Sequence, residues 1–67
     1  MTRITLNTKV YLENPWSGEL IKSTWADVKQ FCAQSVHPID RKQWMYYARM
    51  AVRSQDWTTL GEMIIGS

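Results

Sequence analysis

The sequence contains a single cysteine, Cys32, and a single histidine, His37, among its 67 residues. A single cysteine cannot form an intramolecular disulfide, and these two side chains do not form a zinc-ligand pattern at any usual spacing. Neither has a nucleophile, base or further ligand beside it in the sequence, and the chain contains no glycine-rich phosphate-binding loop. We therefore predict no enzymatic activity, no metal and no cofactor, with Cys32 as a small buried hydrophobic residue and His37 in a local hydrogen bond.

The sequence also lacks long apolar runs and any large excess of charge. No apolar run approaches the roughly 18 residues of a membrane-spanning helix, and the opening MTRITLNTK has no signal-peptide core. These features predict a soluble protein in the reducing cytoplasm, with no membrane contact. Eight Lys and Arg against six Asp and Glu give a net charge of +2, which is small for a dedicated nucleic-acid binder. The distribution of the cations must therefore carry any functional inference.

Aromatic residues, in contrast, are abundant: four Trp, three Tyr and one Phe. A chain of this length suffices for one small domain, residues 1–67, and buries only about 60% of its unfolded surface. Large rings can fill such a small core, and they can also anchor an interface with another protein. We expect both uses here.

The N-terminal part of the chain has the two-residue period of a half-buried strand. Residues 3–13 place an alternating set on one side, which we predict faces the core: Ile4, Leu6, Thr8, Val10 and Leu12. Tyr11 falls on the opposite, outward side. The turn-rich NPWSG follows, and ELIKS is typical of a returning strand. We predict an antiparallel β-hairpin over about residues 3–23, with helices covering its apolar face.

The remainder of the sequence predicts three helices, over about residues 25–36, 41–54 and 57–65. Thr24 with Asp27 resembles a capping box at the first start. At the second start, Asp40 suits the N-cap position, and Ile39 and Trp44 stand where a hydrophobic staple would place them. The predicted fold is therefore α+β, with a two-stranded hairpin packed on three helices in the order ββααα.

The second predicted helix separates into two faces when its residues are placed about 100° apart. One face contains apolar and small residues, which we predict point inward: Trp44, Tyr47, Ala48 and Ala51. The opposite face carries what we call the basic-aromatic stripe: Lys42, Tyr46, Arg49 and Arg53, with Arg41 at its margin. A basic helix face is often only solvated. The ring of Tyr46 between cations favours an interaction surface instead.

Three functional hypotheses follow from this surface. The leading one is a non-enzymatic protein-binding module, an inhibitor or regulator that presents the stripe to a larger protein with an acidic surface. Trp16 in the hairpin loop and Tyr11 on the outer strand face would add contacts. The alternative is a DNA- or RNA-binding regulator, with Lys42, Arg49 and Arg53 on phosphates and Tyr46 stacking on a base. The third is a subunit of a homo-oligomer, because so small a core gains stability from a partner.

The two helices joined by SVHP invite comparison with a helix-turn-helix. The connection lacks a compact glycine-containing turn, however, and Asp40 stands where a recognition helix usually meets bases. We identify no motif of a specific family. In its general style, a very short aromatic-rich chain without a catalytic set, the sequence looks like small accessory proteins of phages and other mobile elements.

Overall fold

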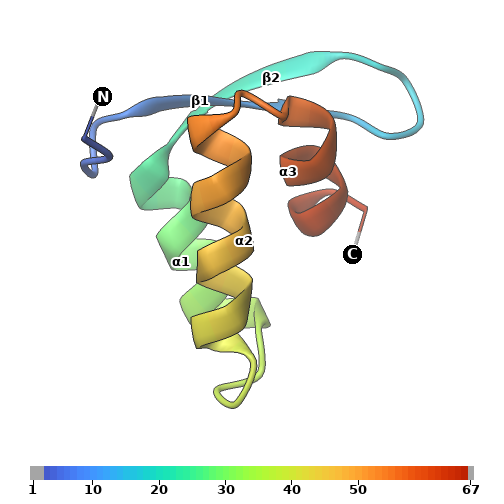
Figure 1. The fold of residues 1–67 in the computed structure, drawn as a ribbon. Coiled ribbons are helices and arrows are strands. Elements are labelled where there is room, and N and C mark those ends of the chain that lie inside the picture. The colour runs from blue at the N-terminus through green and yellow to red at the C-terminus, as the bar shows by residue number, and fades with distance from the viewer. Residues whose placement is uncertain (1–2, 67) are drawn as a thin grey trace.

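A computed structural model describes residues 3–66 of the chain and has the α+β order predicted from the sequence. Its elements are β1 (Lys9–Glu13), β2 (Leu20–Thr24), α1 (Trp25–Ser35), α2 (Arg41–Arg53) and α3 (Trp57–Ile64). The hairpin crosses one end of the α1 and α2 pair, which run side by side in opposite directions (Figure 1). The short helix α3 lies next to α2 beneath the hairpin (Figure 1).

The hairpin is antiparallel, as predicted, with β1 and β2 paired from Lys9↔Thr24 to Glu13↔Leu20. Its loop is organised by Asn14, whose side-chain Oδ1 accepts hydrogen bonds from the backbone N–H groups of Trp16 at 2.8 Å and Ser17 at 3.1 Å. Gly18 has a φ of +75°, a left-handed conformation that glycine adopts without steric cost. The loop therefore has a defined turn, and the ring of Trp16 projects from it into solvent.

The predicted first strand is too long, because residues 3–8 are not part of the sheet. The partner strand ends at Thr24, where the chain becomes α1, so these residues have no strand to pair with. Their carbonyls instead accept hydrogen bonds from the start of α1: Trp25 N–H to Thr8 at 2.9 Å and Ala26 N–H to Leu6 at 3.1 Å. The inward orientation predicted for Leu6 is wrong, since its side chain is 55% exposed.

The first helix begins with the cap that the sequence predicts. The carboxylate of Asp27 accepts hydrogen bonds from the Ser23 hydroxyl at 2.8 Å and from the Thr24 backbone N–H at 3.3 Å. These bonds, the Ser23 hydroxyl first, lower the pKa of Asp27 below its ordinary value of 3.8. Asp27 is therefore a structural carboxylate that fixes the junction between β2 and α1.

The start of α2 differs from the predicted staple. Asp40 occupies the N-cap position, but Ile39 is 84% exposed and does not pack on Trp44 as a staple would. A local turn sets the direction of the chain instead: the Asp40 N–H donates to the His37 carbonyl at 2.8 Å, and the Ile39 N–H donates to Nδ1 of His37 at 3.2 Å. His37 thus has the local hydrogen-bonding role expected from the sequence.

The core lies where the hairpin meets the helices. Its buried side chains are Val10, Leu12, Trp25, Val28, Ala48, Ala51, Val52 and Leu60. Cys32 is buried as well, as predicted, and has a free thiol. Ala48 and Ala51 are the inward residues of α2 that the sequence identified, but Tyr47 is not, because 51% of its side chain is exposed. No helix of residues 3–66 is long and apolar enough to cross a membrane.

The end of α2 turns sharply into α3. The Gln55 N–H donates to the Val52 carbonyl at 3.1 Å, and the Asp56 N–H donates to the Ala51 carbonyl at 2.8 Å. This pair of bonds is a Schellman motif, in which the residue after the helix takes a left-handed conformation. Gln55 occupies that position with a φ of 56°, where glycine is the usual residue.

Helix α3 is held against β1 by a close backbone approach. Gly61 is buried, and a Cβ at this position would overlap the carbonyl oxygen of Glu13. The Thr58 hydroxyl also donates to the Glu13 carboxylate at 3.0 Å. At the start of the helix, Asp56 accepts from the Thr59 hydroxyl at 2.7 Å and from its N–H at 3.2 Å, which lowers the pKa of Asp56.

Candidate binding surface

The basic-aromatic stripe is exposed along α2, as the sequence predicts for Lys42, Tyr46, Arg49 and Arg53. Within residues 3–66, none of its cations is paired with a carboxylate. The ring of Tyr46 contacts that of Tyr47 edge to face, with centroids 5.7 Å apart. The stripe is thus a real feature of the surface, whereas its role in binding stays a prediction.

Arg41, predicted at the margin of the stripe, has a structural contact of its own. Its guanidinium donates from Nε to the Val36 carbonyl at 3.0 Å and from Nη2 to the Ala33 carbonyl at 2.8 Å. These acceptors belong to the C-terminal end of α1, where carbonyls lack helical partners and a cation is favoured. Arg41 therefore ties α1 to α2, and its guanidinium is already engaged.

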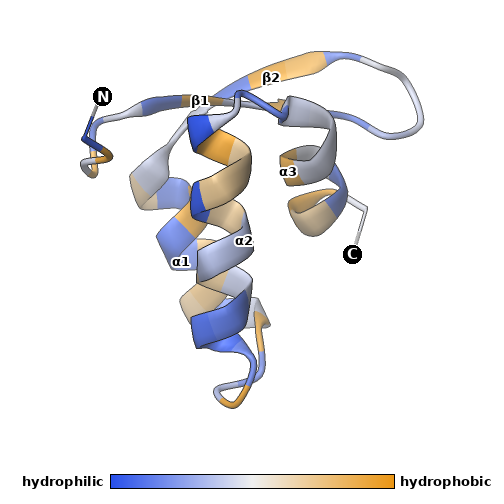
Figure 2. Cartoon of the chain, in the orientation of Figure 1, coloured by the Kyte–Doolittle hydropathy of each residue, from blue (hydrophilic) through white to orange (hydrophobic). Residues whose placement is uncertain are grey.

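The two hairpin aromatics differ in their position relative to the stripe, because Tyr11 lines a cavity together with Arg53 and Trp16 does not. Trp16 is 75% exposed in a loop that projects beyond α3 (Figure 1). Tyr11 is half-buried and packs edge to face on Trp57 of α3, with centroids 5.6 Å apart, so it supports the fold. The first part of β2 is also hydrophobic (Figure 2), and Leu20 there is exposed. The structure therefore brings Tyr11 and Arg53 together but does not unite all the predicted partner-binding residues in one surface.

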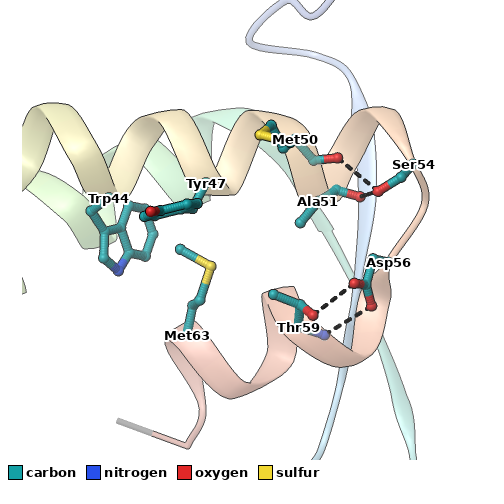
Figure 3. A pocket seen from close by; sticks show the side chains of 8 residues that line it. All are labelled: Trp44, Tyr47, Met50, Ala51, Ser54, Asp56, Thr59 and Met63. Atoms are coloured by element: carbon teal, nitrogen blue, oxygen red, sulfur yellow. Dashed lines mark hydrogen bonds between the residues drawn. The ribbon is translucent and has the colours of Figure 1, made fainter.

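A groove of about 480 Å³ lies between α2 and α3, on the side of α2 where Tyr47 emerges (Figure 3). Met63 reaches from α3 toward Trp44 and Tyr47, while Met50 stands farther along α2 (Figure 3). Eight residues line it: Trp44, Tyr47, Met50, Ala51, Ser54, Asp56, Thr59 and Met63. The groove exists because α3 is only eight residues long and packs against β1. The helix therefore does not fill the space beside α2.

Three polar side chains of the groove, Ser54, Asp56 and Thr59, gather at one end and form hydrogen bonds within the protein. The Ser54 hydroxyl donates to the Met50 carbonyl at 2.8 Å, and Asp56 is occupied by Thr59 through two hydrogen bonds (Figure 3). The rest of the lining is aromatic, thioether and methyl surface, with the indole N–H of Trp44 and the hydroxyl of Tyr47 at the other end (Figure 3). Such a groove favours a largely apolar ligand, because polar groups placed along its thioether and methyl surface would lose water without finding partners.

The apolar surface continues past Tyr47 toward the start of α2. Tyr47 also lines a second, more open hollow with Ile39, Lys42, Gln43 and Tyr46. The exposed side chain of Ile39 therefore belongs to the same face as the groove. Lys42 is the one charged residue among the lining residues of this second hollow.

The sequence interpretation missed Met50, Met63 and the exposure of Tyr47. The sequence did contain a signal for Met50, because residues three apart on a helix are neighbours and Met50 therefore adjoins Tyr47. The position of Met63 depends on how α3 docks, which a periodic pattern does not specify. Among residues 3–66, no three His, Cys, Asp or Glu side chains come together in a way that could hold a metal ion.

Searches against models of protein families, curated proteins and solved structures found no match to this chain.

Proposed function

We propose that this protein is a non-enzymatic binding module that receives an amphipathic helix of a larger protein in the groove between α2 and α3. The observation that carries the proposal is the groove itself: its walls are mostly apolar, and the polar side chains at its Ser54 end already form hydrogen bonds within the protein. Tyr47 and Met50 are each about half exposed there, at 51% and 50%. Covering them with a partner would remove the Tyr47 ring and the Met50 thioether from water.

The dimensions and residue types of the groove favour a helix. From Trp44 to Ser54, the α2 wall rises over ten residues, or about 15 Å. A partner helix of two to three turns has that length and would place side chains i, i+4 and i+7 along the groove. Met50 and Met63 add flexible thioether side chains, which adapt their shape to such anchors.

Charge favours an acidic partner. Lys42 borders the second hollow, and the unpaired cations Arg49 and Arg53 lie on the outer side of the same helix. A partner with acidic residues beside its apolar anchors would be attracted by this field and would associate faster. A module that contributes contacts and no chemistry acts by blocking or repositioning its partner, so we assign it a regulatory or inhibitory effect. The free buried thiol of Cys32 fits a cytoplasmic location.

The test is selection of helical peptides from a displayed random library, followed by titration of the isotope-labelled protein. We expect selected peptides to carry Leu, Phe or Trp at helical spacing with Asp or Glu beside them, and to shift the amides around Tyr47, Met50 and Met63. Met50→Gln should weaken such a peptide by roughly 10-fold, because its amide would be buried without a partner. Leu20→Gln, at a similarly exposed position on the hairpin, is the matched control and should bind like the parent.

Other results would contradict this proposal. If the selected peptides bind the Met50→Gln variant unchanged, or shift only the loop around Trp16, the groove is not the docking site. If the protein itself sediments as a dimer that Met50→Gln dissociates, the occupant of the groove is a second copy.

DNA or RNA binding is the second candidate, because the stripe leaves Lys42, Arg49 and Arg53 unpaired within the described chain. In that case, oligonucleotide binding should weaken steeply with salt, and Arg49→Glu with Arg53→Glu should abolish it. Met50→Gln should leave it intact. Titration of the same variants with an oligonucleotide at two salt concentrations separates the two functions.

A further inference from the structure

A second cavity, of about 490 Å³, lies on the other flank of α2 from the groove. It is built from the N-terminal segment, β1, the end of α2 and the start of α3, which are distant in sequence. Its lining residues are Arg3, Ile4, Thr8, Lys9, Tyr11, Val52, Arg53, Gln55 and Trp57. We call this cavity the basic pocket.

Three cations surround the basic pocket: Arg3, Lys9 and Arg53. No Asp or Glu is among the lining residues, and none of the three forms an ion pair within residues 3–66. Like charges around one cavity repel one another and concentrate anions from solution. An anion with two or more negative charges would relieve this repulsion, and arginine forks suit phosphate oxygens in particular.

The pocket also has an apolar wall and a neutral polar side chain. Tyr11 and Trp57 form the wall through their edge-to-face contact, with Val52 beside them. Gln55 lines the pocket although its left-handed backbone favours glycine, so an L side chain is held there at an energetic cost. Its amide is exposed and could donate to an anion.

We propose that the basic pocket binds a phosphate-bearing small molecule, with the phosphates between Arg3, Lys9 and Arg53 and the organic part against Tyr11 and Trp57. The volume lies within the range of small-molecule sites, and a lining that combines three cations with two aromatic rings suits a ligand with one anionic and one flat end. The peptide groove does not contribute to this site, so the inference stands independently of the proposed function.

The test is titration of the isotope-labelled protein with inorganic pyrophosphate and with adenosine diphosphate at physiological salt. Both should bind saturably and shift the indole N–H signal of Trp57, and the nucleotide should bind more tightly because its ring gains the aromatic wall. Arg53→Gln and Lys9→Gln should each weaken binding by roughly 5-fold, the loss expected for one exposed charged contact. Arg49→Gln, one turn away on α2 and outside the pocket, should have no effect.

Three outcomes would overturn the assignment. If neither probe binds saturably at millimolar concentration, the basic pocket does not bind phosphate-bearing small molecules. An equal loss in Arg49→Gln would mean that the anions only sense the general positive field. Tighter binding of a short single-stranded oligonucleotide that also depends on Arg49 would assign the phosphates to a nucleic acid along the stripe.

Discussion

Gln55 is the residue at which the chain departs most clearly from conformational preference. Its left-handed backbone costs an L residue about 1–2 kcal/mol, whereas glycine adopts it freely but loses about 0.5–1 kcal/mol more in chain entropy on folding. We therefore predict that Gln55→Gly stabilises the protein by about 0.5–1 kcal/mol in urea unfolding. Gln55→Ala keeps the penalty and is the control. If the turn carried no strain, Gln55→Gly would instead be less stable than Gln55→Ala by about 0.5–1 kcal/mol, the entropy cost of glycine.

Two neighbouring tyrosines illustrate how far single residues could be predicted. Tyr46 is exposed as expected, because a helical wheel places it opposite Ala48 and Ala51. Tyr47 lies at the boundary of the apolar face, where exposure depends on how much of α2 a neighbour covers. Helix α3 is too short to cover it, and the length and docking of α3 are properties of the tertiary structure. The wheel therefore identified the stripe and missed the groove.

At the scale of elements, the hairpin shows that an alternating sequence pattern does not determine which residues pair in a sheet. The alternation of residues 3–13 predicts one long strand, but a strand needs a partner, and β2 ends where α1 begins. Only the second half of the alternating segment is paired. The antiparallel hairpin and its loop could be predicted from the sequence, while its length could not, because the end of the partner strand is set by the cap of α1.

This difference makes Leu6 and Val10 a matched pair for mutation. Val10 is fully buried, so Val10→Ala should cost about 2 kcal/mol in lost apolar burial and a residual cavity. Leu6→Ala removes more carbon atoms but from an exposed side chain, and should cost below about 0.5 kcal/mol. Chemical denaturation of both variants measures this difference. A larger loss for Leu6→Ala would mean that residues 3–8 continue the strand in solution.

The junction of α3 with β1 depends on a glycine, which has no side chain. Because a Cβ at Gly61 would overlap the Glu13 carbonyl, Gly61→Ala must push the helix off the strand, with an expected cost of about 3 kcal/mol or more. Gly18→Ala is the control, since a Cβ there meets open space and only the left-handed φ is strained, at about 1 kcal/mol. Thermal unfolding should rank the two variants in this order; the reverse order would contradict the close approach.

At the scale of the whole molecule, the groove and the basic pocket lie on opposite sides of α2. Met50 and Arg53 are three residues apart, yet one lines the groove and the other the basic pocket. We predict that Met50→Gln weakens peptide binding without changing pyrophosphate affinity, and that Arg53→Gln alters pyrophosphate affinity while leaving most peptide affinity. The double variant should show the sum of the two effects, measured by titration calorimetry. Loss of both activities in either single variant would mean that they share one site.

The order of elements across the whole chain followed from periodicity and caps, which act over a few residues. The groove and the basic pocket could not be predicted in this way, because each is lined by segments that only the tertiary packing brings together. Lys9 and Arg53, for example, are 44 positions apart and were assigned separately to a strand and to the stripe. Local signals therefore predicted the fold class and one exposed face, while the concave surfaces required the packed structure.

The contact between Gly61 and Glu13 also has a consequence for biosynthesis. The last helix covers the first strand, so a ribosome must translate residues 57–64 before the apolar side of β1 can be enclosed. Until then the nascent chain exposes Val10 and Leu12 without Leu60 to cover them, and exposed apolar surface of this kind attracts chaperones and proteases. We therefore expect a chain that lacks residues 57–64 to be degraded faster in cells than one that contains them.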